Sequence, residues 1–345
     1  MQNQTENFEM YTGRYINIPA ILDLGFPYTI IVAMRGGGKT YGALQEMVNR
    51  RERFIYFRRT DRSLKMCVSP YYHVFRELNL NNGWKIEPDY NRELNLGVFR
   101  DPESEEIIGY AANLSTFAGI RSIGSAKALG IKWLIFDEFI PQQGEAKRYN
   151  IFDAWSNADE TLTRNSSDDW PVRRLLMANS DTIRGDVIAG YGIGDTYMMM
   201  QETGQEITAY SQDMVLLRPG CAELAAFKAD TPLYRVTAGS HFSDVALRNT
   251  FLISDRSKIG KRNLGEYTPV CGINHIFIYR HKTRRGEYYV SPTAAGKMKI
   301  YKEGSAETKR YLRDQTALWR AYLKGKMYYE TLQVQTVFLQ IYDEE

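Results

Sequence analysis

The first two hundred residues contain short apolar runs rich in Ile, Val, Phe and Tyr, each bounded by turn residues or by a helical pattern. A strand that is buried on both faces is continuously apolar, whereas a strand with one face in water alternates between apolar and polar positions. The runs here are continuous, which predicts a mostly parallel sheet covered on both faces. They occupy residues 28–34, 54–58, 109–115, 133–136 and 173–177.

Helical patterns fall between these runs, over residues 40–51, 69–78 and 149–164. Strands that alternate with helices are typical of a wound α/β domain. We therefore expect an α/β domain over residues 1–200.

The pattern changes after about residue 195. Residues 195–230 contain a Met-rich run and a mixed segment, and we expect a small helical linker over 201–230. Two aromatic-rich runs then flank a basic, glycine-ended turn at 275–290, which predicts a β-hairpin. A helix is expected over 307–324, with its apolar side buried. These elements predict a second, smaller α+β domain over 231–345.

Composition narrows the class of protein. The longest nearly pure apolar run, at 28–34, is far too short to span a bilayer, and the first residues show no signal-peptide pattern, so we expect a cytoplasmic protein. The three cysteines, Cys67, Cys221 and Cys271, are far apart and lack the spacing of a zinc site. We expect reduced thiols and no structural metal.

The net charge of +3 is unevenly distributed. Residues 1–230 hold 25 Lys and Arg against 30 Asp and Glu, a charge of −5, whereas residues 231–345 hold 19 against 11, a charge of +8. A basic carboxy-terminal domain fits a nucleic-acid surface, because phosphate contacts come from Lys and Arg. An ordinary basic domain would look the same, so charge alone leaves both readings open.

A glycine-rich segment, AMRGGGKT at 33–40, follows the first predicted strand. It matches the second half of the phosphate-loop pattern G-x-x-x-x-G-K-[ST], with Ala33 in place of the first glycine. Gly36, Gly37 and Gly38 let successive backbone N–H groups turn toward one centre, and a helix that begins near residue 39 adds its positive end. A plain strand-to-helix turn is the alternative, but it requires neither three glycines nor a lysine.

The polar residues of this segment have expected roles toward a nucleotide. Lys39 would reach the β and γ phosphates, and the Thr40 hydroxyl would ligate Mg²⁺. Arg35, which is unusual inside such a loop, would touch the γ phosphate. ATP and Mg²⁺ are therefore the expected cofactors.

Two adjacent acids follow the apolar run at 133–136. Asp137 would hold the Mg²⁺ shell, and Glu138 would polarise the attacking water. Acids placed directly after four buried residues are costly unless a cation or a water network receives them. A strand that ends in solvated acids is the alternative. Together the two motifs predict an ATPase of the additional-strand, catalytic-glutamate type.

Residues 162–181 place Arg164 before a further strand that ends near Asn179. Motor ATPases sense the γ phosphate with a polar residue at such a strand end, which makes Asn179 a candidate sensor. A turn-forming asparagine at a strand end fits the local sequence equally well.

The sequence resembles the DNA-packaging ATPases of phi-29-type short-tailed bacteriophages, large-terminase-like motors that package the viral genome. The segments that carry the resemblance are AMRGGGKTY, FIYFRR at 54–59, IFDEFIP at 135–141, TRN at 163–165 and LLMANS at 175–180. The resemblance covers the first two hundred residues well, and the remainder only in general layout.

This resemblance implies a P-loop ATPase domain (ASCE/RecA-like) and a homomeric ring, pentameric in the family. The ring would dock on the portal vertex of an empty procapsid in the host bacterial cytoplasm and pump double-stranded DNA inward. Arg164 would be an arginine finger that acts on the neighbouring subunit. The resemblance also allows a scaffold RNA as a further partner, and it implies no membrane.

Two basic loops, at 60–65 and 121–130, match the position of pore-facing loops in the family. Their candidate DNA contacts are Arg62, Lys65, Arg121 and Lys127. For any one of them, a solvated surface charge is the simpler reading.

The resemblance also implies a carboxy-terminal domain like an RNase H-like nuclease, in which clustered acids hold two metals. Basic residues stand in the corresponding hairpin, and only Glu287 is acidic nearby, so we expect a degenerate nuclease that does not cleave. Lys282, Arg284 and Arg285, with the basic segment 256–262, would bind the nucleic acid backbone. A structural basic hairpin is the alternative. The basic residues are Arg280, His281, Lys282, Arg284 and Arg285.

Two other functions share these motifs. A helicase or another nucleic-acid-remodelling ATPase would need further motifs that we do not find. An ATP-dependent capsid-assembly switch would not require a base at Glu138.

Overall fold

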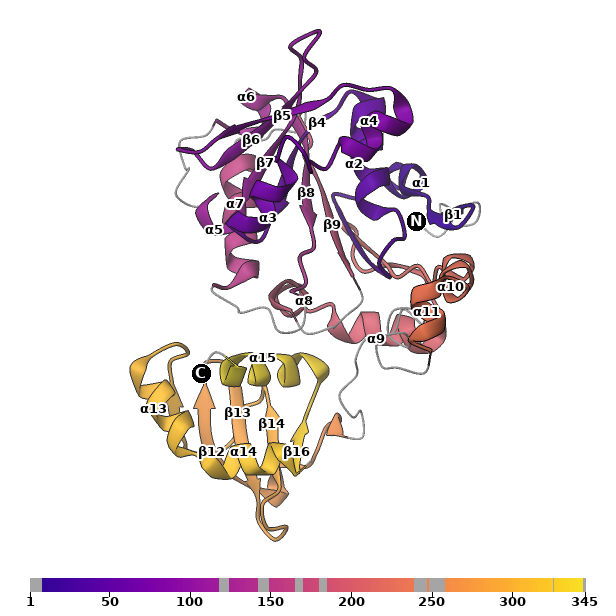
Figure 1. The fold of residues 1–345 in the computed structure, drawn as a ribbon. Coiled ribbons are helices and arrows are strands. Elements are labelled where there is room, and N and C mark those ends of the chain that lie inside the picture. Colours follow the sequence, from indigo (N-terminus) through magenta and orange to yellow (C-terminus); the bar gives the residue numbers. More distant parts are fainter. Residues whose placement is uncertain are drawn as a thin grey trace. The chain divides into compact units, whose positions relative to one another are not determined.

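The computed structural model describes residues 8–117, 124–141, 149–164, 170–179, 185–238, 247, 258–324 and 326–343 (Figure 1). The chain divides into two compact units. The first is formed by Met1–Val187 with Tyr197–Leu252, and the second by Ile188–Thr196 with Ile253–Glu345.

A mixed, mostly parallel sheet forms the centre of the first unit. Within the described residues its strands are β3 (Tyr28–Ala33), β4 (Arg53–Arg58), β5 (Glu87–Asn91), β6 (Leu96–Arg100), β7 (Ile107–Asn113), β8 (Ile131–Asp137), β9 (Arg173–Asn179), β10 (Ile207–Ala209) and β11 (Met214–Leu217). Their order is β10-β11-β3-β9-β8-β4-β7-β6-β5. The strands from β11 to β7 in this order are parallel, and antiparallel strands flank them.

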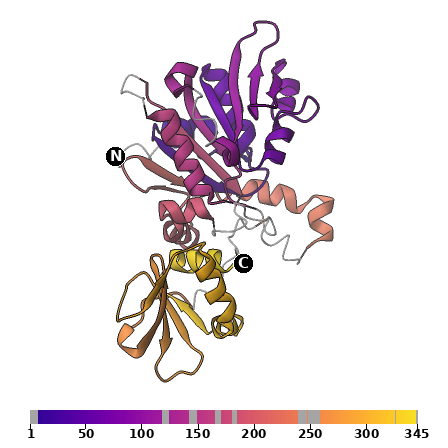
Figure 2. The same ribbon diagram turned by 90° about the vertical axis from the view of Figure 1, so that its left-hand side faces the viewer.

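Helices cover both faces of this sheet (Figures 1 and 2). On one face, the core contains residues of α2 with alternate residues of the central strands, such as Ile31, Tyr56 and Ile135. On the other face, Trp155 of α7 packs against the rings of Phe57 and Phe136. The continuous apolar runs therefore predicted the sheet correctly. Among the described residues up to 238, the helices are α1 (Ile18–Asp23), α2 (Lys39–Arg50), α3 (Asp61–Cys67), α4 (Arg76–Asn82), α5 (Leu114–Phe117), α6 (Ala126–Leu129), α7 (Ile151–Thr163), α8 (Asp186–Tyr191), α9 (Gly194–Thr203), α10 (Ala222–Ala229) and α11 (Pro232–Val236). Residues 188–196, in α8 and at the start of α9, belong to the second unit.

Two predictions between residues 60 and 78 were wrong. Residues 60–65 are not a loop, because Thr60 and Ser63 form a capping box that starts α3. The helix predicted at 69–78 is replaced by turns over 69–75 and the start of α4. Pro70 accounts for the break, since a proline disfavours a helical conformation of the residue before it.

The predicted linker at 201–230 was also wrong, since these residues hold the end of α9, the strands β10 and β11, and α10. β11 pairs in parallel with β3, and all four of its residues are buried. A four-residue apolar run is too short to be told from a buried turn of helix by pattern alone.

The second unit contains a smaller sheet of order β15-β12-β13-β14-β16. β13 and β14 pair antiparallel, which confirms the hairpin predicted at 275–290. The helix predicted at 307–324 is interrupted at Gln315, whose backbone is not helical, so that α13 and α14 take its place. The elements are β12 (Tyr267–Ile273), β13 (Ile276–His281), β14 (Tyr288–Ser291), β15 (Lys299–Tyr301), β16 (Met327–Tyr329), α13 (Ala306–Asp314), α14 (Thr316–Leu323) and α15 (Leu332–Asp343).

Cys67, Cys221 and Cys271 are buried and free. Across the described part of the chain, no helix has the length and apolarity needed to cross a bilayer.

Candidate active site

The glycine turn between β3 and α2 has a left-handed backbone at two of its glycines. Gly36 has φ = +77° and Gly38 has φ = +82°, in the left-handed region that glycine adopts without strain. Gly38 is the N-cap residue of α2 and, as a glycine, provides no side-chain cap. The start of a helix, with its first N–H groups and its positive dipole end, suits an anion.

A short amino-terminal hairpin, β1 (Tyr11–Thr12) with β2 (Tyr15–Ile16), supports this turn. The Ile16 amide donates to the Gly37 carbonyl at 3.0 Å. A Cβ atom at Gly37 would lie 3.1 Å from Ile16 Cδ1, so this position must be small. The hairpin thus holds the turn through a backbone hydrogen bond and a side-chain contact of Ile16.

Lys39 is buried beneath the turn and close to Asn179. Its Nζ donates to the carbonyls of Ala33 at 3.0 Å and Met34 at 2.9 Å, and to Asn179 Oδ1 at 3.3 Å. Asn179 comes close because β3 and β9 are parallel neighbours and Ala33 pairs with Asn179 in their register. The structure therefore brings together a phosphate-loop lysine and a strand-end amide that the sequence placed 140 positions apart.

Thr40 and Asp137 meet at the same edge of the sheet. Thr40 Oγ1 donates to Asp137 Oδ2 at 2.8 Å. β9 lies between β3 and β8, which is the inserted strand expected of the additional-strand class. A hydroxyl and a carboxylate are oxygen ligands of the kind that Mg²⁺ takes. These two residues fit a magnesium ion shared with a nucleotide.

Glu138 follows Asp137 in a left-handed conformation, with φ = +54°. Such a backbone is strained for a residue with a side chain, and strain of this kind clusters at functional sites. Its side chain is 36% exposed, against 5% for Asp137. The two adjacent acids therefore have different surroundings: one is enclosed, and the other reaches solvent.

Arg58, which the sequence analysis did not assign to the site, bridges the two acids. Its Nη1 lies 3.3 Å from Asp137 Oδ2, and its Nη2 forms an ion pair with the Glu138 carboxylate. Arg59 Nε donates to the Glu138 carbonyl at 2.6 Å. The signal was the run FIYFRR, because an arginine that directly follows buried residues needs an acidic partner.

The donors around Asp137 keep their protons. Tyr56 donates to Asp137 Oδ2 at 2.5 Å, and burial, followed by the charge of Asp137, raises the pKa of Tyr56 well above its ordinary value. Burial alone would lower the pKa of Arg58, but Tyr56 and Asp137 outweigh it and raise that pKa. Arg58 is therefore a permanent cation beside both acids.

Arg164 lies at the opposite edge of the sheet from Lys39. α7 connects the parallel strands β8 and β9, so its end approaches the amino end of β9. Asp159 of α7 accepts a hydrogen bond from Tyr28 OH at 2.7 Å and pairs with Arg174 Nη2 at 2.6 Å. Tyr28 and Arg174 lie at the starts of β3 and β9, so this part of α7 is at the amino ends of the strands. Arg164, one turn further along, is exposed. An arginine so placed cannot serve the glycine turn of its own chain.

The candidate DNA contacts in α3 and α6 lie at opposite ends of the sheet's strands. Arg62 and Lys65 are exposed in α3, which follows the carboxyl end of β4, and Lys65 pairs with Asp61 at 2.6 Å. Lys127 is exposed in α6, which precedes the amino end of β8. These residues are therefore not brought together, and Arg121 lies outside the described residues.

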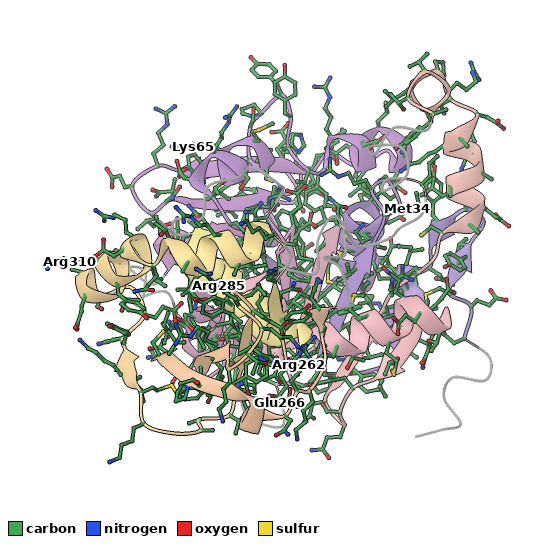
Figure 3. The ribbon with its side chains drawn as sticks, turned by 90° about the horizontal axis from the view of Figure 1, so that it is seen from below. Met34, Lys65, Arg262, Glu266, Arg285 and Arg310 are labelled. Atoms are coloured by element: carbon green, nitrogen blue, oxygen red, sulfur yellow. The ribbon has the colours of Figure 1, made fainter. Side chains whose placement is uncertain are left out.

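The basic hairpin of the second unit surrounds a buried acid. Glu287 Oε1 lies 3.2 Å from Arg262 Nη1 and 3.4 Å from Arg284 Nη1. Arg262, which is labelled in Figure 3, also covers the Tyr328 ring, 3.5 Å from its centroid. The ammonium of Lys282 donates to the Gly265 carbonyl at 2.6 Å. Part of the basic charge is thus structural, while Arg284, Arg285 and Lys282 remain exposed.

No arrangement of three or more His, Cys, Asp or Glu side chains suited to a metal ion occurs among the described residues. The single buried carboxylate of the hairpin is engaged by arginines, as above.

The sequence matches no protein-family model and no curated protein. Solved structures do match. The phi-28 gp11 DNA packaging motor aligns with a TM-score of 0.65 and 14% identity, over 96% of this chain and 98% of that one. The bacteriophage phi-29 viral genome packaging motor assembly aligns with a TM-score of 0.58 and 16% identity, over 96% and 99%. The chain therefore has the fold of these proteins over nearly its whole length, which confirms the predicted resemblance at the level of fold.

Proposed function

We propose that this chain is the ATPase of a bacteriophage DNA-packaging motor, which uses ATP hydrolysis to translocate double-stranded DNA into a procapsid. The observation that carries the proposal is the convergence of an uncapped glycine turn, Lys39, Thr40, Asp137 and Asn179 at one sheet edge. The full-length fold likeness to two packaging motors supports the assignment of substrate and partner.

ATP would bind with its phosphates in the glycine turn. Lys39 would exchange its loop carbonyls for phosphate oxygens, with Asn179 beside it and Arg35 toward the γ phosphate. Mg²⁺ would be held by Thr40 and Asp137, where it supplies Lewis-acid stabilisation of the phosphate charge. The 2.8 Å approach of these two side chains supports the pairing.

Glu138 would orient the attacking water and accept its proton as water adds to the γ phosphorus and ADP leaves. Arg58 holds the Glu138 carboxylate in an ion pair. A base that is paired with a permanent cation is weaker, because the cation stabilises its ionised form. Hydrolysis therefore requires Glu138 to leave Arg58, which offers a point where DNA could control turnover.

Assembly would complete the site. Arg164 is exposed at the far edge of the sheet, so it would act on a neighbouring subunit's nucleotide in a ring, pentameric as in the family the sequence resembles. The portal of the procapsid, and a scaffold RNA, are further proposed partners, and the ring would work in the host cytoplasm at the portal vertex.

Mixing two inactive variants tests this arrangement. Arg164→Ala should leave ATP binding by the isolated chain intact and remove the activity that depends on assembly. Mixed with Glu138→Gln, it should recover part of the ATPase rate, because some interfaces then join an intact Glu138 to an intact Arg164. The steady-state rate across mixing ratios is the measurement. A mixture as inactive as either variant alone would contradict action between subunits.

We further propose that the second unit is a nuclease-like domain that binds DNA without cutting it. Its acid, Glu287, is neutralised by Arg262 and Arg284, while Lys282, Arg284 and Arg285 project from the turn. Exposed cations of this kind bind phosphate backbone independently of sequence. The contacts of Arg62, Lys65, Arg121 and Lys127 with DNA are likewise proposed.

The DNA dependence of the ATPase distinguishes this function from its rivals. Blunt duplex DNA should accelerate ATP hydrolysis by the assembled chain and should remain fully paired during turnover. Rate measurements on a blunt duplex labelled for strand separation test both points. Unwinding would favour a helicase, and a slow rate that Glu138→Gln leaves unchanged would favour an assembly switch.

A further inference from the structure

A second lysine reaches the glycine turn from the segment beyond β11. β11 is the parallel neighbour of β3 on the side away from β9, so the chain leaves β11 at the same sheet edge as the turn. α10 then begins after Cys221 and carries Lys228 in its last turn. The segment 218–229 therefore borders the nucleotide site on the side opposite Asn179.

The contact of Lys228 with the turn is direct. Its Nζ donates to the Arg35 carbonyl. A Cβ atom built on Gly36 would lie 3.2 Å from this Nζ and 3.3 Å from Cε. The lysine therefore covers the turn at the position where Gly36 has no side chain. Lys39 caps the carbonyls of Ala33 and Met34. Two ammonium groups thus hold three successive carbonyls of one loop.

Charge around this contact favours an added anion. In the described part of the chain no carboxylate lies within ion-pair distance of Lys228. Burial lowers the pKa of Lys228, the Cys221 thiol opposes this, and the Arg35 cation lowers it further, for a net decrease. Positive charge is therefore in excess beside the turn, where Lys228 donates to a neutral carbonyl.

We propose that Lys228 is a second phosphate-binding lysine, which exchanges the Arg35 carbonyl for a phosphate oxygen when a nucleoside di- or triphosphate enters the glycine turn. This inference rests on the nucleotide binding proposed above. A phosphate oxygen is the stronger acceptor, because a hydrogen bond between two charged groups exceeds one to a neutral carbonyl. The flexible lysine stem permits the exchange while α10 stays in place.

Binding of ATPγS to the full-length chain, measured by titration calorimetry, tests the role of Lys228. Lys228→Met should weaken binding roughly tenfold or more, as expected for a lost charge-assisted hydrogen bond. Lys228→Arg, which keeps the charge, should stay within about threefold of the wild type. The matched control is Arg235→Met in α11, where the exposed arginine donates to the Asp230 carbonyl; it should bind as the wild type does.

If Lys228 only linked α10 to the loop and did not bind phosphate, a different result is expected. Lys228→Gln keeps a donor for the Arg35 carbonyl but loses the charge, and it should show the same loss of ATPγS affinity as Lys228→Met at an unchanged melting temperature. Wild-type affinity in the folded Lys228→Gln protein would overturn the inference. If Lys39→Ala loses ATPγS binding in the same series, the proposed function survives that result. A wild-type chain that binds no ATPγS would overturn both.

Discussion

Replacing Lys39 with alanine should abolish ATP binding. Its ammonium is buried beneath the glycine turn and would make the charge-assisted bonds to the β and γ phosphates. Losing two such bonds at about 1.5–3 kcal/mol each weakens binding by at least ~100-fold. The variant should also melt at a lower temperature, because the Ala33 and Met34 carbonyls lose their donor.

Equilibrium titration with a fluorescent ATP analogue, well below the melting temperature of the variant, measures this effect. Lys85→Ala is the matched control, since Lys85 forms an exposed ion pair with Glu103 far along the chain from the turn. It should bind the analogue as the wild type does. Unchanged affinity in the folded Lys39→Ala protein would place the nucleotide elsewhere.

Glu138→Gln should retain ATP binding and stop hydrolysis. Glutamine matches glutamate in shape but cannot accept a proton from water, and general bases contribute about 10²–10⁴-fold to rate. The side chain is also held by Arg58 and not by the glycine turn that would bind the phosphates. We therefore expect a rate loss of that size with nearly unchanged affinity.

Single-turnover hydrolysis with pre-bound ATP separates the chemical step from binding. Asp137→Asn gives the matched contrast, because Asp137 is enclosed by Thr40 and Tyr56 and would hold Mg²⁺. That variant should lose the magnesium dependence of nucleotide affinity, whereas Glu138→Gln should keep it. A Glu138→Gln chain that hydrolyses ATP at the wild-type rate would remove Glu138 from the chemistry.

Local patterns predicted the sheet and the loop because each depends on neighbouring residues. A run such as 28–34 is apolar on both faces only where both faces are covered, and successive glycines permit the left-handed turn at Gly36 and Gly38. The parallel register of such a sheet then brings Asn179 to Lys39. These parts of the site follow from pattern and topology together.

Contacts between distant segments could not be predicted in the same way. Arg58 and Glu138 are separated by 80 positions, and Lys228 and Arg35 by 193, with no local pattern that links them. β11, the strand that precedes α10 and Lys228, is only four residues long, and the sequence pattern predicts a linker there. This short apolar run forms a strand because it pairs with β3, and that pairing joins distant parts of the chain.

The most direct test is the structure of this chain with Mg²⁺ and a non-hydrolysable ATP analogue. Our account predicts the triphosphate against the backbone amides of the glycine turn, with Lys39 on the phosphates, the metal at Thr40 and Asp137, and the Glu138 carboxylate facing the γ phosphate. An analogue bound away from the turn, or a metal away from Asp137, would contradict it.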